Sequence, residues 1–524
     1  MTNHRSTFLI LIPLTLALLS PGVATAQASK PNILIAIADD ASHMGESVSW
    51  VETPSFDRVA AAGLRFSNAY TPNAKCAPSR ASLITARNSW QLKEAANHFN
   101  NFPAEFKTYP EALRDLGYAT GYTGKGWGPG DAGEVDGRPR ELLGASWRDE
   151  MHEPPTEDMS TVDYASNFIS FFESKPEGQP FHFWYGAHEP HRRYSYGSAL
   201  EAGKKLSDID RVPGYFPDND TVRTDLLDYA LEIEHFDTQL GRILDYLEEQ
   251  GELDGTLVVV TSDNGMPFPR AKSDEYEASN HVPLAMMWGK NIQNPGRVIE
   301  QYVSFVDIAP TLFDVAGFNW GETGMQSSPG TSLRSFLEGD VPAMRDFVLI
   351  GKERHDVGRP GDYGYPIRGI VKDGWLYLRN YRPDLWPAGN PETGYSTVDK
   401  SPTKTEVLQA RHSPDTRHFW DWSFGKRPDE ELCRLADDPD CLDNLASDAA
   451  YAAVKEDLRT TMETELRAQE DPRMFGRGDV FHTYYFTWDL VRNYYERRIL
   501  QSEDLVPPWI QESDIETDLM SDPR

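Results

Sequence analysis

Cysteine and positive charge are both scarce in this chain of 524 residues. It has three cysteines, and 51 lysines and arginines stand against 82 aspartates and glutamates, which gives a formal net charge of -31. So few cysteines exclude a small scaffold held together by disulfides. The strong negative charge argues against general binding to nucleic acid or to an anionic membrane surface, because both would be repelled. An anionic substrate would need basic side chains gathered locally.

Long apolar runs are also missing after the first thirty residues, so the sequence predicts no membrane span. The one apolar run covers 7–19, follows His4 and Arg5, and precedes the small-residue sequence Ala-Thr-Ala at 24–26. This pattern is typical of a secretory signal peptide and is too short to cross a bilayer. We therefore predict a signal peptide over 1–26. No cysteine lies near the cleavage point to carry a lipid anchor, so we expect a soluble protein that is secreted or periplasmic.

Export makes disulfides possible. Cys433 and Cys441 enclose the short segment "CRLADDPDC", and the sequence allows either a bridge or two reduced thiols there. In both cases Cys76 is left without a partner. An unpaired cysteine in an exported protein is either a small buried apolar residue or a reactive group.

Four stretches share one pattern, in which an apolar strand ends in a polar cluster. They are "PNILIAIADD" (31–40), "YATGYTGKGWGPG" (118–130), "PFHFWYGAHEPHR" (180–192) and "TLVVVTSDNG" (256–265). Amphipathic helices are predicted between them, the clearest over 222–249 and another over 53–64 with Thr53 as its cap. Apolar strands alternating with such helices predict a mainly parallel central sheet flanked by helices on both faces. The four polar clusters would then meet at the carboxyl edge of that sheet.

The pattern changes after about Tyr365. "PIRGIVKDGWLYLRNYRPDLW" (366–386) reads as antiparallel strands and turns, and an amphipathic helix follows later in the chain. The sequence thus predicts a large α/β domain over 30–365. A smaller C-terminal α+β subdomain with an antiparallel sheet and an acidic tail is predicted over 366–524.

Acidic and amide side chains end two of the predicted strands. Asp39 and Asp40 follow one strand, and Asp263 and Asn264 follow another. Three carboxylates at one sheet edge would repel one another unless a cation joined them. Oxygen ligands favour a hard cation, calcium or magnesium, over zinc. The competing interpretation is that all four are ordinary turn residues.

The surroundings of Cys76 predict a helix start. In "NAKCAPSRASL" (73–83), Pro78 suits the first turn of a helix. Cys76 would then lie at the positive end of that helix, beside Arg80. Such a place favours negative charge at position 76, whether on a bound substrate or on the side chain itself.

The motif at 76–80, Cys-Ala-Pro-Ser-Arg, resembles the C-x-P-S-R signature of formylglycine-dependent (type I) sulfatases, which have the alkaline-phosphatase-like fold. In that family the cysteine is oxidised to formylglycine (3-oxoalanine), an aldehyde whose hydrate is the nucleophile. The resemblance runs from "PNILIAIADD" through "YTGKGW", "AHEPH" and "TSDNG" to "DPDCLDNLA". The stretches "AHEPHR" and "SDNGMPFP" look most like the heparan N-sulfatase branch and its bacterial relatives.

The resemblance implies a role for each matching residue. A single calcium ion, rather than magnesium, would be held by the four strand-end side chains and by the modified cysteine: Asp39, Asp40, Asp263, Asn264 and Cys76. The catalytic set would be Cys76 as nucleophile, Arg80 holding its hydrate, Lys125 on the hydrate or sulfate oxygens, His188 protonating the leaving group, and Lys272 gripping sulfate. One position departs from the pattern. Trp127 stands where the family commonly has the histidine of K-x-H, so no residue is assigned to that histidine's role.

Three further residues are predicted to bind substrate. His191 closes the "HEPH" sequence and is expected to face the substrate. The segment 351–366 is rich in basic residues and glycine, and we expect a rim loop there that binds the sugar through His355 and Arg359.

The sequence therefore predicts a secreted sulfatase that acts on sulfated polysaccharide or oligosaccharide, such as algal ulvan or heparan-type glycans. Its partners would be the sulfated glycan and a formylglycine-generating or other sulfatase-maturing enzyme. Two alternatives remain: a phosphonate monoester or phosphodiester hydrolase of the same superfamily, and a non-catalytic protein that binds sulfated glycans. The intact C-x-P-S-R motif together with both metal-binding pairs argues against the non-catalytic alternative.

Overall fold

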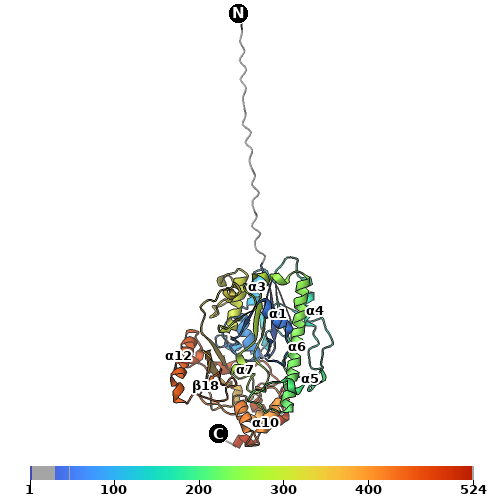
Figure 1. Cartoon of the computed structure of the whole chain (residues 1–524). Helices are drawn as coiled ribbons and strands as arrows, with labels where there is room; N and C mark the ends of the chain where they lie inside the picture. Colours follow the sequence, from blue (N-terminus) through green and yellow to red (C-terminus); the bar gives the residue numbers. More distant parts are fainter. Residues whose placement is uncertain (3–29, 46–47, 522–524) are drawn as a thin grey trace. The chain divides into compact units, whose positions relative to one another are not determined.

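Eight strands form the large sheet of the protein (Figure 1). The structure is a computed structural model that describes residues 1–2, 30–45 and 48–521. The predicted signal peptide (1–26) lies outside the described residues, apart from its first two. From one edge to the other, the strands are β13 (Arg297–Ile299), β2 (Leu64–Phe66), β12 (Leu284–Met287), β11 (Thr256–Ser262), β1 (Asn32–Ala38), β10 (Phe181–Gly186), β5 (Ala119–Gly124) and β9 (Ala145–Trp147).

Most neighbouring strands of this sheet run parallel, as the sequence predicts. β11, β1, β10, β5 and β9 are parallel to their neighbours in that order. β12 is the exception, because it runs antiparallel to both β11 and β2. The four strands that end in polar clusters are therefore adjacent and point the same way.

Strand β1 explains why an unbroken apolar run forms here. All seven of its residues are buried. Leu34 and Ala36 belong to one apolar core, whereas Ile33 and Ile35 belong to another. Because successive side chains of a strand point to opposite faces, the sheet is covered on both.

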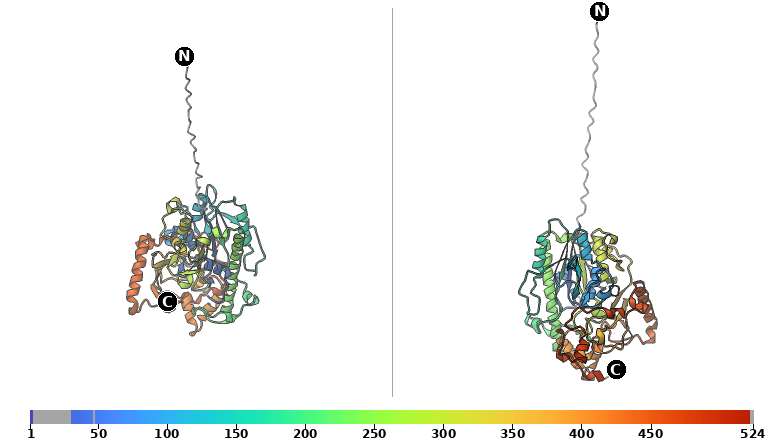
Figure 2. Two further views of the ribbon diagram at one scale, coloured as in Figure 1. Left: turned by 45° about the horizontal axis from the view of Figure 1, so that its top comes forward. Right: turned by 180° about the vertical axis from the view of Figure 1, so that it is seen from behind.

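Helices supply the rest of both cores. Helix α6 (Asp220–Glu249) contributes much of the first core and runs along one side of the sheet (Figures 1 and 2). The other helices that contribute to the first core are α1 (Pro54–Ala62), α4 (Tyr164–Ser174), α5 (Ser198–Glu201), α10 (Pro402–Ala410) and α11 (Arg417–Phe424). The second core takes α2 (Cys76–Thr85), α3 (Tyr109–Asp115), α8 (Ile308–Val315) and α9 (Arg334–Leu337). The short helix α7 (Glu277–Asn280) lies between β11 and β12 in the chain.

The start of α1 differs from the prediction. The helix begins at Pro54 as expected, but the hydroxyl of Thr53 makes no capping hydrogen bond. It accepts from the backbone N–H of Gly45 instead. The carboxylate of Asp237, on α6, accepts from the N–H groups of Ser55 and Phe56, each at 2.8 Å. The N–H groups at the start of α1 are thus capped by a side chain from another helix, and not by the neighbouring Thr53 as the sequence predicted.

A second sheet, entirely antiparallel, is formed by β15 (Phe347–Lys352), β16 (Ile367–Lys372), β17 (Trp375–Asn380) and β18 (Glu430–Arg434). Helix α12 (Ala452–Ala468) packs against it through Leu458 and Met462. Its first strand precedes the predicted boundary at 365, so this sheet begins earlier in the chain than expected. Tyr70 and Tyr276 share a core with Cys433 of this sheet. The described residues from 31 to 521 form one compact unit.

The remaining elements are short. Three two-stranded sheets pair β14 (Val303–Ser304) with β3 (Ala69–Tyr70), β4 (Asn100–Asn101) with β6 (Gly130–Asp131), and β7 (Glu134–Val135) with β8 (Arg138–Pro139), and a last short helix is α13 (Val480–Thr483). Cys433 and Cys441 form a disulfide, which decides the alternative left open by the sequence. Within the described ranges, no helix is both long enough and apolar enough to cross a bilayer.

Candidate active site

The ends of the central strands are in register. Ala38 of β1 pairs with Ser262 of β11, while Gly186 of β10 pairs with Ile37 on one side and Gly124 on the other. The residues that follow these strands must therefore emerge side by side. Gly124 and Gly186 permit the close approach: a Cβ on Gly124, whose φ is +68°, would lie 2.1 Å from the carbonyl oxygen of Gly186.

Three carboxylates meet at this edge. Asp39, Asp40 and Asp263 are buried, and one oxygen from each lies within 4.8 Å of the others. Asp40 has a φ of +74°, a conformation that L-residues rarely adopt. This backbone turn lets two consecutive aspartates serve the same cluster. Such strain is found preferentially at functional sites.

Three cations balance these carboxylates. Nζ of Lys125 lies 2.5 Å from Asp39, and Nζ of Lys272 lies 2.7 Å from Asp40. Nε of Arg80 donates to Asp263 at 2.8 Å. Lys125, Arg80 and Lys272 come from different parts of the chain, and the fold brings all three to one cluster.

The pKa values follow from burial and from these contacts. Burial opposes ionisation of Asp39, but the positive charges of Lys125, His191 and Arg80 together hold its pKa well below the usual value. Burial raises the pKa of Asp263 to about 7, although Arg80 acts in the opposite direction. The cluster therefore holds carboxyl groups and cations close together where water does not solvate them.

Two oxygen atoms in the cluster fit a cation that is not part of the structure. Oδ1 of Asp39 and Oδ1 of Asn264 are buried and have no hydrogen-bond partner. Nδ2 of Asn264 donates to Asp40 at 2.8 Å, which leaves its carbonyl oxygen free. Buried oxygens without partners are costly, and a hard cation would satisfy them. The donors present are thus those that calcium or magnesium prefers.

Cys76 begins helix α2, as predicted, and is the free cysteine of the described residues. Its Sγ lies 3.9 Å from Oδ1 of Asp40. The negative charge expected at this position, on a substrate or on an oxyanion formed from the side chain, does not extend to the thiol itself. Burial raises the pKa of Cys76 far above its usual value, and Asp39 adds to the effect although Lys125 opposes it. The unmodified side chain is therefore a neutral thiol.

The other polar residues of the motif fasten α2 to the sheet edge. The hydroxyl of Ser79 donates to the carbonyl oxygen of Asp263 at 2.5 Å. Arg80 holds the carboxylate of Asp263 and also donates to the carbonyl oxygen of Gly126 at 2.7 Å. The motif thus fixes the position of Cys76 relative to the carboxylates.

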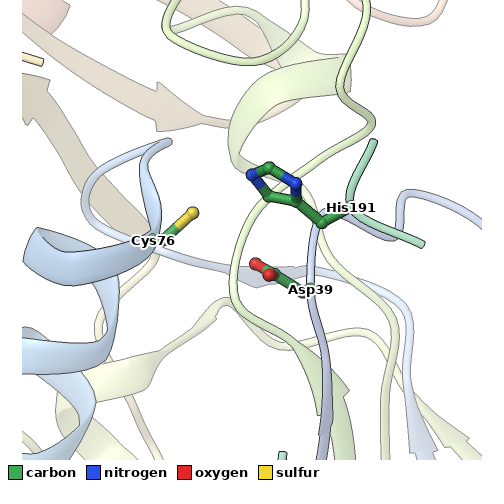
Figure 3. A group of neighbouring side chains, drawn as sticks. All are labelled: Asp39, Cys76 and His191. Carbon is green, nitrogen blue, oxygen red and sulfur yellow. The ribbon is translucent and has the colours of Figure 1, made fainter. Parts of the chain in front are cut away.

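His188 and His191 take different places. His188 follows β10, and its side chain is exposed to a cavity that opens onto the cluster. Desolvation by the surrounding protein lowers the pKa of His188, and the carboxylates of Glu189 and Asp39 only partly oppose that shift. A nitrogen of His191 lies within 4.8 Å of both Cys76 Sγ and a carboxylate oxygen of Asp39, and Figure 3 shows the three side chains together. His191 is thus a near neighbour of Cys76, closer to the cluster than the sequence suggested.

Several other residues lie at this site although the sequence did not predict them there. Asp399, in the loop after β17, lies 3.1 Å from Nζ of Lys272 and lines the same cavity. Lys75, beside Cys76, pairs with Asp356 at 2.8 Å, and Asp356 also contacts Nδ1 of His98 at 2.9 Å. These contacts join segments that are more than one hundred residues apart, so no local pattern points to them.

Two predicted sugar-binding residues are not on a rim. His355 and Arg359 are 2% and 1% exposed. Nε2 of His355 contacts Oδ1 of Asn73 at 2.7 Å, and Arg359 donates to the carbonyl oxygens of Trp386 and Pro387. Both side chains are thus corrected from a rim to the interior, because they find protein acceptors rather than solvent.

Trp127 stands where the family commonly has a histidine. It is buried in the second core and packs edge-to-face against Phe102 at 5.1 Å. The chain here directs an aromatic ring away from the cluster. The histidines that line the cavity are His98, His188 and His191, among the described residues.

One cavity of about 750 Å³ opens onto the cluster. Its basic lining residues are Lys75, Lys125, Arg148, Arg192, Arg193 and Lys272. Acidic residues line the cavity as well, namely Asp39, Asp158, Glu189, Glu232, Asp356 and Asp399. Five of the six basic residues are paired with carboxylates, so the positive charge offered to a ligand comes from groups that the cluster holds in place. The size of the cavity lies in the range of about 300–1,000 Å³ that suits small-molecule sites.

The mainly parallel sheet, with a charged cluster at its carboxyl edge and a separate antiparallel sheet, has the alkaline-phosphatase-like fold that the sequence predicted. Residues 31–318 match the sulfatase family, and the chain therefore belongs to that family of sulfuric ester hydrolases.

The relatives agree with this assignment. The chain is 27% identical over 486 residues to N-sulphoglucosamine sulphohydrolase of Homo sapiens, covering 85% of this chain and 92% of that protein. It is 26% identical over 483 residues to an ulvan-active sulfatase of Formosa agariphila, covering 84% and 76%. The fold is also similar to that of the phosphonate monoester hydrolase of Agrobacterium radiobacter, with a TM-score of 0.61, 20% identity, and coverage of 84% and 96%.

Proposed function

We propose that this protein removes sulfate from sulfated glycans, using a formylglycine formed from Cys76 and one bound calcium ion. The observation that carries the proposal is the position of Cys76. It begins a helix that Ser79 and Arg80 tie to Asp263, beside buried oxygens of Asp39 and Asn264 that have no hydrogen-bond partner. A buried neutral thiol has little use there, whereas an aldehyde hydrate would meet both the cluster and the cavity.

The proposed substrate class is a sulfated amino sugar or a sulfated algal polysaccharide. The two relatives support this choice, because one is an N-sulphoglucosamine sulphohydrolase and the other an ulvan-active sulfatase. The basic residues of the cavity would receive the sulfate group, since they are the positive charges that an otherwise acidic protein offers there.

The proposed calcium ligands are the residues predicted from the sequence: Asp39, Asp40, Asp263, Asn264 and the modified Cys76. Calcium bound there would stabilise negative charge on the sulfate oxygens. Lys125 and Lys272 are placed to add to that stabilisation, since each already contacts a carboxylate of the cluster. Arg80 would hold the side chain at position 76 in place.

His188 is the proposed proton donor to the leaving oxygen or nitrogen. His188 lines the cavity. Desolvation lowers its pKa below the usual value, and the nearby carboxylates of Glu189 and Asp39 oppose that shift without reversing it. Histidine is suited to this role because its ordinary pKa lies near neutral pH. His191 is proposed to contact the substrate beside Cys76.

The proposed setting is outside the cytoplasm, either secreted or periplasmic. The support is the signal-peptide pattern at 1–26, together with a disulfide between Cys433 and Cys441. A sulfatase-maturing enzyme would be the obligatory partner, because Cys76 must be oxidised before the site can act.

A phosphonate monoester or phosphodiester hydrolase is the second candidate. The fold of the Agrobacterium radiobacter enzyme supports it, and the absence of the family's usual histidine at Trp127 marks this site as atypical. A non-catalytic glycan-binding protein is the third.

The deciding experiment compares sulfate and phosphate chemistry in one preparation. The protein would be produced with a maturing enzyme, and conversion of Cys76 confirmed by peptide mass. We expect sulfate release from defined heparan or ulvan oligosaccharides, and none from a Cys76→Ala variant. Cleavage of phosphodiesters or phosphonate monoesters without sulfate release would favour the second candidate, and binding without turnover of either would favour the third.

A further inference from the structure

Three of the aromatic rings that line the cavity pack against one another and have no part in the proposed chemistry. They are Phe99, Trp488 and Trp509, named here the aromatic wall. The ring centroids of Phe99 and Trp488 lie 5.1 Å apart, and those of Trp488 and Trp509 lie 5.3 Å apart. Two of the three come from the C-terminal part of the chain, which the sequence did not connect to the site.

The aromatic wall packs on the outside of a small apolar core. The buried residues of this core are Val357, Phe486, Val491, Tyr494 and Ile510, and none of them lines the cavity. The wall residues pack against that core but remain only partly buried. Apolar ring surface left facing a cavity is unfavourable in water and becomes favourable when a ligand covers it.

The backbone holds the rings in fixed positions. Nε1 of Trp509 donates to the carbonyl oxygen of Ser396 at 2.7 Å, so its polar atom is already used. The carbonyl oxygen of Phe99 accepts from the N–H of Thr487 at 2.9 Å. Phe99 itself has a φ of +48°, a strained conformation for a bulky residue. A preorganised ring face binds a ligand with less loss of conformational entropy.

The aromatic wall is continuous with the reaction centre. Phe99 follows His98, which contacts Asp356, which in turn pairs with Lys75 beside Cys76. Ser396, which anchors Trp509, belongs to the loop that carries Asp399, the partner of Lys272. A molecule whose sulfate lies at Cys76 would thus extend toward the rings.

We propose that the aromatic wall is a sugar-binding subsite, in which a pyranose ring of the sulfated glycan stacks its C–H face on Trp488 and Trp509. This inference rests on the proposed function and names how the same site selects a glycan over a small sulfate ester. Charge complementarity supports an anionic sugar. Arg148 lines the cavity, is exposed, and forms no ion pair with any described residue.

The test measures binding apart from turnover. The Cys76→Ala protein, which cannot form the aldehyde, would be titrated with defined heparan and ulvan tetrasaccharides by calorimetry. Trp488→Leu and Trp509→Leu, each made in that protein, are expected to bind about ten-fold more weakly, which corresponds to about 1.4 kcal/mol. The same loss is expected with desulfated tetrasaccharides, because the rings contact the sugar rather than the sulfate.

Trp320→Leu is the matched control. Trp320 is also partly buried, its Nε1 also donates to a backbone carbonyl, that of Gln326 at 3.2 Å, and it does not line the cavity. It should bind as the parent does. Trp509→Phe keeps an apolar ring and should recover most of the affinity, which separates loss of stacking from loss of folding.

A second measurement needs no substitution in the wall. Tetrasaccharide should protect Trp488 and Trp509 from oxidation by N-bromosuccinimide, followed by peptide mass spectrometry, whereas inorganic sulfate should not. Equal oxidation with and without sugar, parental affinity in both leucine variants, or no sugar binding by the parent would each overturn the subsite.

The two proposals can fail separately. Sulfate release by the matured enzyme tests the sulfatase chemistry, and binding by the Cys76→Ala protein tests the wall. Wall-dependent sugar binding without any sulfate release would retain the subsite and reject the chemistry. Sulfate release by the matured enzyme, together with wall variants that bind sugar as the parent does, would retain the sulfatase chemistry and reject the subsite.

Discussion

At the scale of single residues, Arg80 connects the motif to the sheet. It is buried, and its guanidinium reaches Asp263 and the carbonyl oxygen of Gly126 at once. Lysine lacks the planar fork that makes this set of contacts. The arginine of the C-x-P-S-R motif therefore stabilises the fold, in addition to the role proposed for it beside Cys76.

Replacing Arg80 by alanine should destabilise the fold strongly. It would leave Asp263 buried next to Asp39 without a counter-ion, and breaking a buried pair in this way typically costs about 3–5 kcal/mol. Urea unfolding of the metal-free protein would measure the loss. Arg58→Ala is the control, since Arg58 pairs with Asp245, which is 67% exposed, and such surface pairs contribute about 0–1 kcal/mol. Equal losses in the two variants would contradict this account.

His188→Gln should act on catalysis according to the leaving group. Loss of a general acid typically lowers the rate by about 10²–10⁴-fold. We expect that loss of kcat with a sugar sulfate, whose leaving alcohol needs a proton, and a much smaller one with an aryl sulfate, whose phenolate leaves readily. A uniform decrease for both substrates would assign His188 to binding rather than to proton donation.

At the scale of elements, the first turn of α1 is held by a distant carboxylate. Asp237 accepts from two N–H groups of the helix start, a task the sequence assigns to Thr53. A sequence reading favours the nearest capping residue because it sees only neighbours in the chain. The packing of α6 against α1 supplied a stronger acceptor.

Asp237→Ala should therefore destabilise the protein by about 1–2 kcal/mol at neutral pH, the usual cost of losing a helix cap. The free energy of unfolding in urea gives the measurement. Because burial raises the pKa of Asp237 in the folded state to about 6, above that of an aspartate in the unfolded chain, the folded parent takes up a proton first as the pH falls and gains stability relative to the variant. The cost of the substitution should therefore grow between pH 7 and pH 5. A cost independent of pH across that range would argue against this buried carboxyl as the partner of the helix start.

At the scale of the whole molecule, the proposed cation would connect segments that are far apart in the chain. Its ligands follow β1 and β11 and begin α2, so binding links elements that are far apart in sequence. A ligand that binds only the folded state stabilises it, by about 2.7 kcal/mol at one hundred times its dissociation constant.

Calcium should accordingly raise the Tm of the metal-free protein, and a chelator should reverse the shift. Magnesium should act more weakly, because it requires stricter octahedral geometry. Asn264→Ala, which removes an oxygen that has no other partner, should reduce the calcium shift. Differential scanning calorimetry would measure all three, and a calcium shift unchanged in that variant would place the ion elsewhere.

Acid stability is also a property of the whole molecule. Burial lowers the pKa of His98 to about 4, of His182 to about 3 and of His235 to about 4. The folded state keeps them neutral, whereas the unfolded chain protonates them near pH 6.5. Their stabilisation is therefore complete above pH 6.5 and is lost as the pH falls toward 4, at about 1.4 kcal/mol per unit of pKa shift.

His182→Gln isolates this effect, because the ring of His182 is fully buried in β10. Its free energy of unfolding, measured in urea from pH 7 to pH 4.5, should fall less steeply than that of the parent by up to about 1.4 kcal/mol per pH unit. Parallel curves for the two proteins would show that His182 is protonated in both states alike.

Local sequence determined much of this protein. Unbroken apolar runs specified buried parallel strands, and the polar residues after them specified a site at the carboxyl edge. The C-x-P-S-R motif placed Cys76 at a helix start and pointed to the family. These features are readable because strand periodicity, turn residues and helix starts depend on neighbours in the chain.

Only the tertiary structure decided the rest. It put His355 and Arg359 in the interior, added Asp399 to Lys272, and brought Trp488 and Trp509 to the cavity. A basic or aromatic side chain looks the same in sequence whether it faces solvent, a backbone carbonyl or a ligand. Which of these it meets depends on long-range packing, and so does the desolvation that keeps the Cys76 thiol neutral.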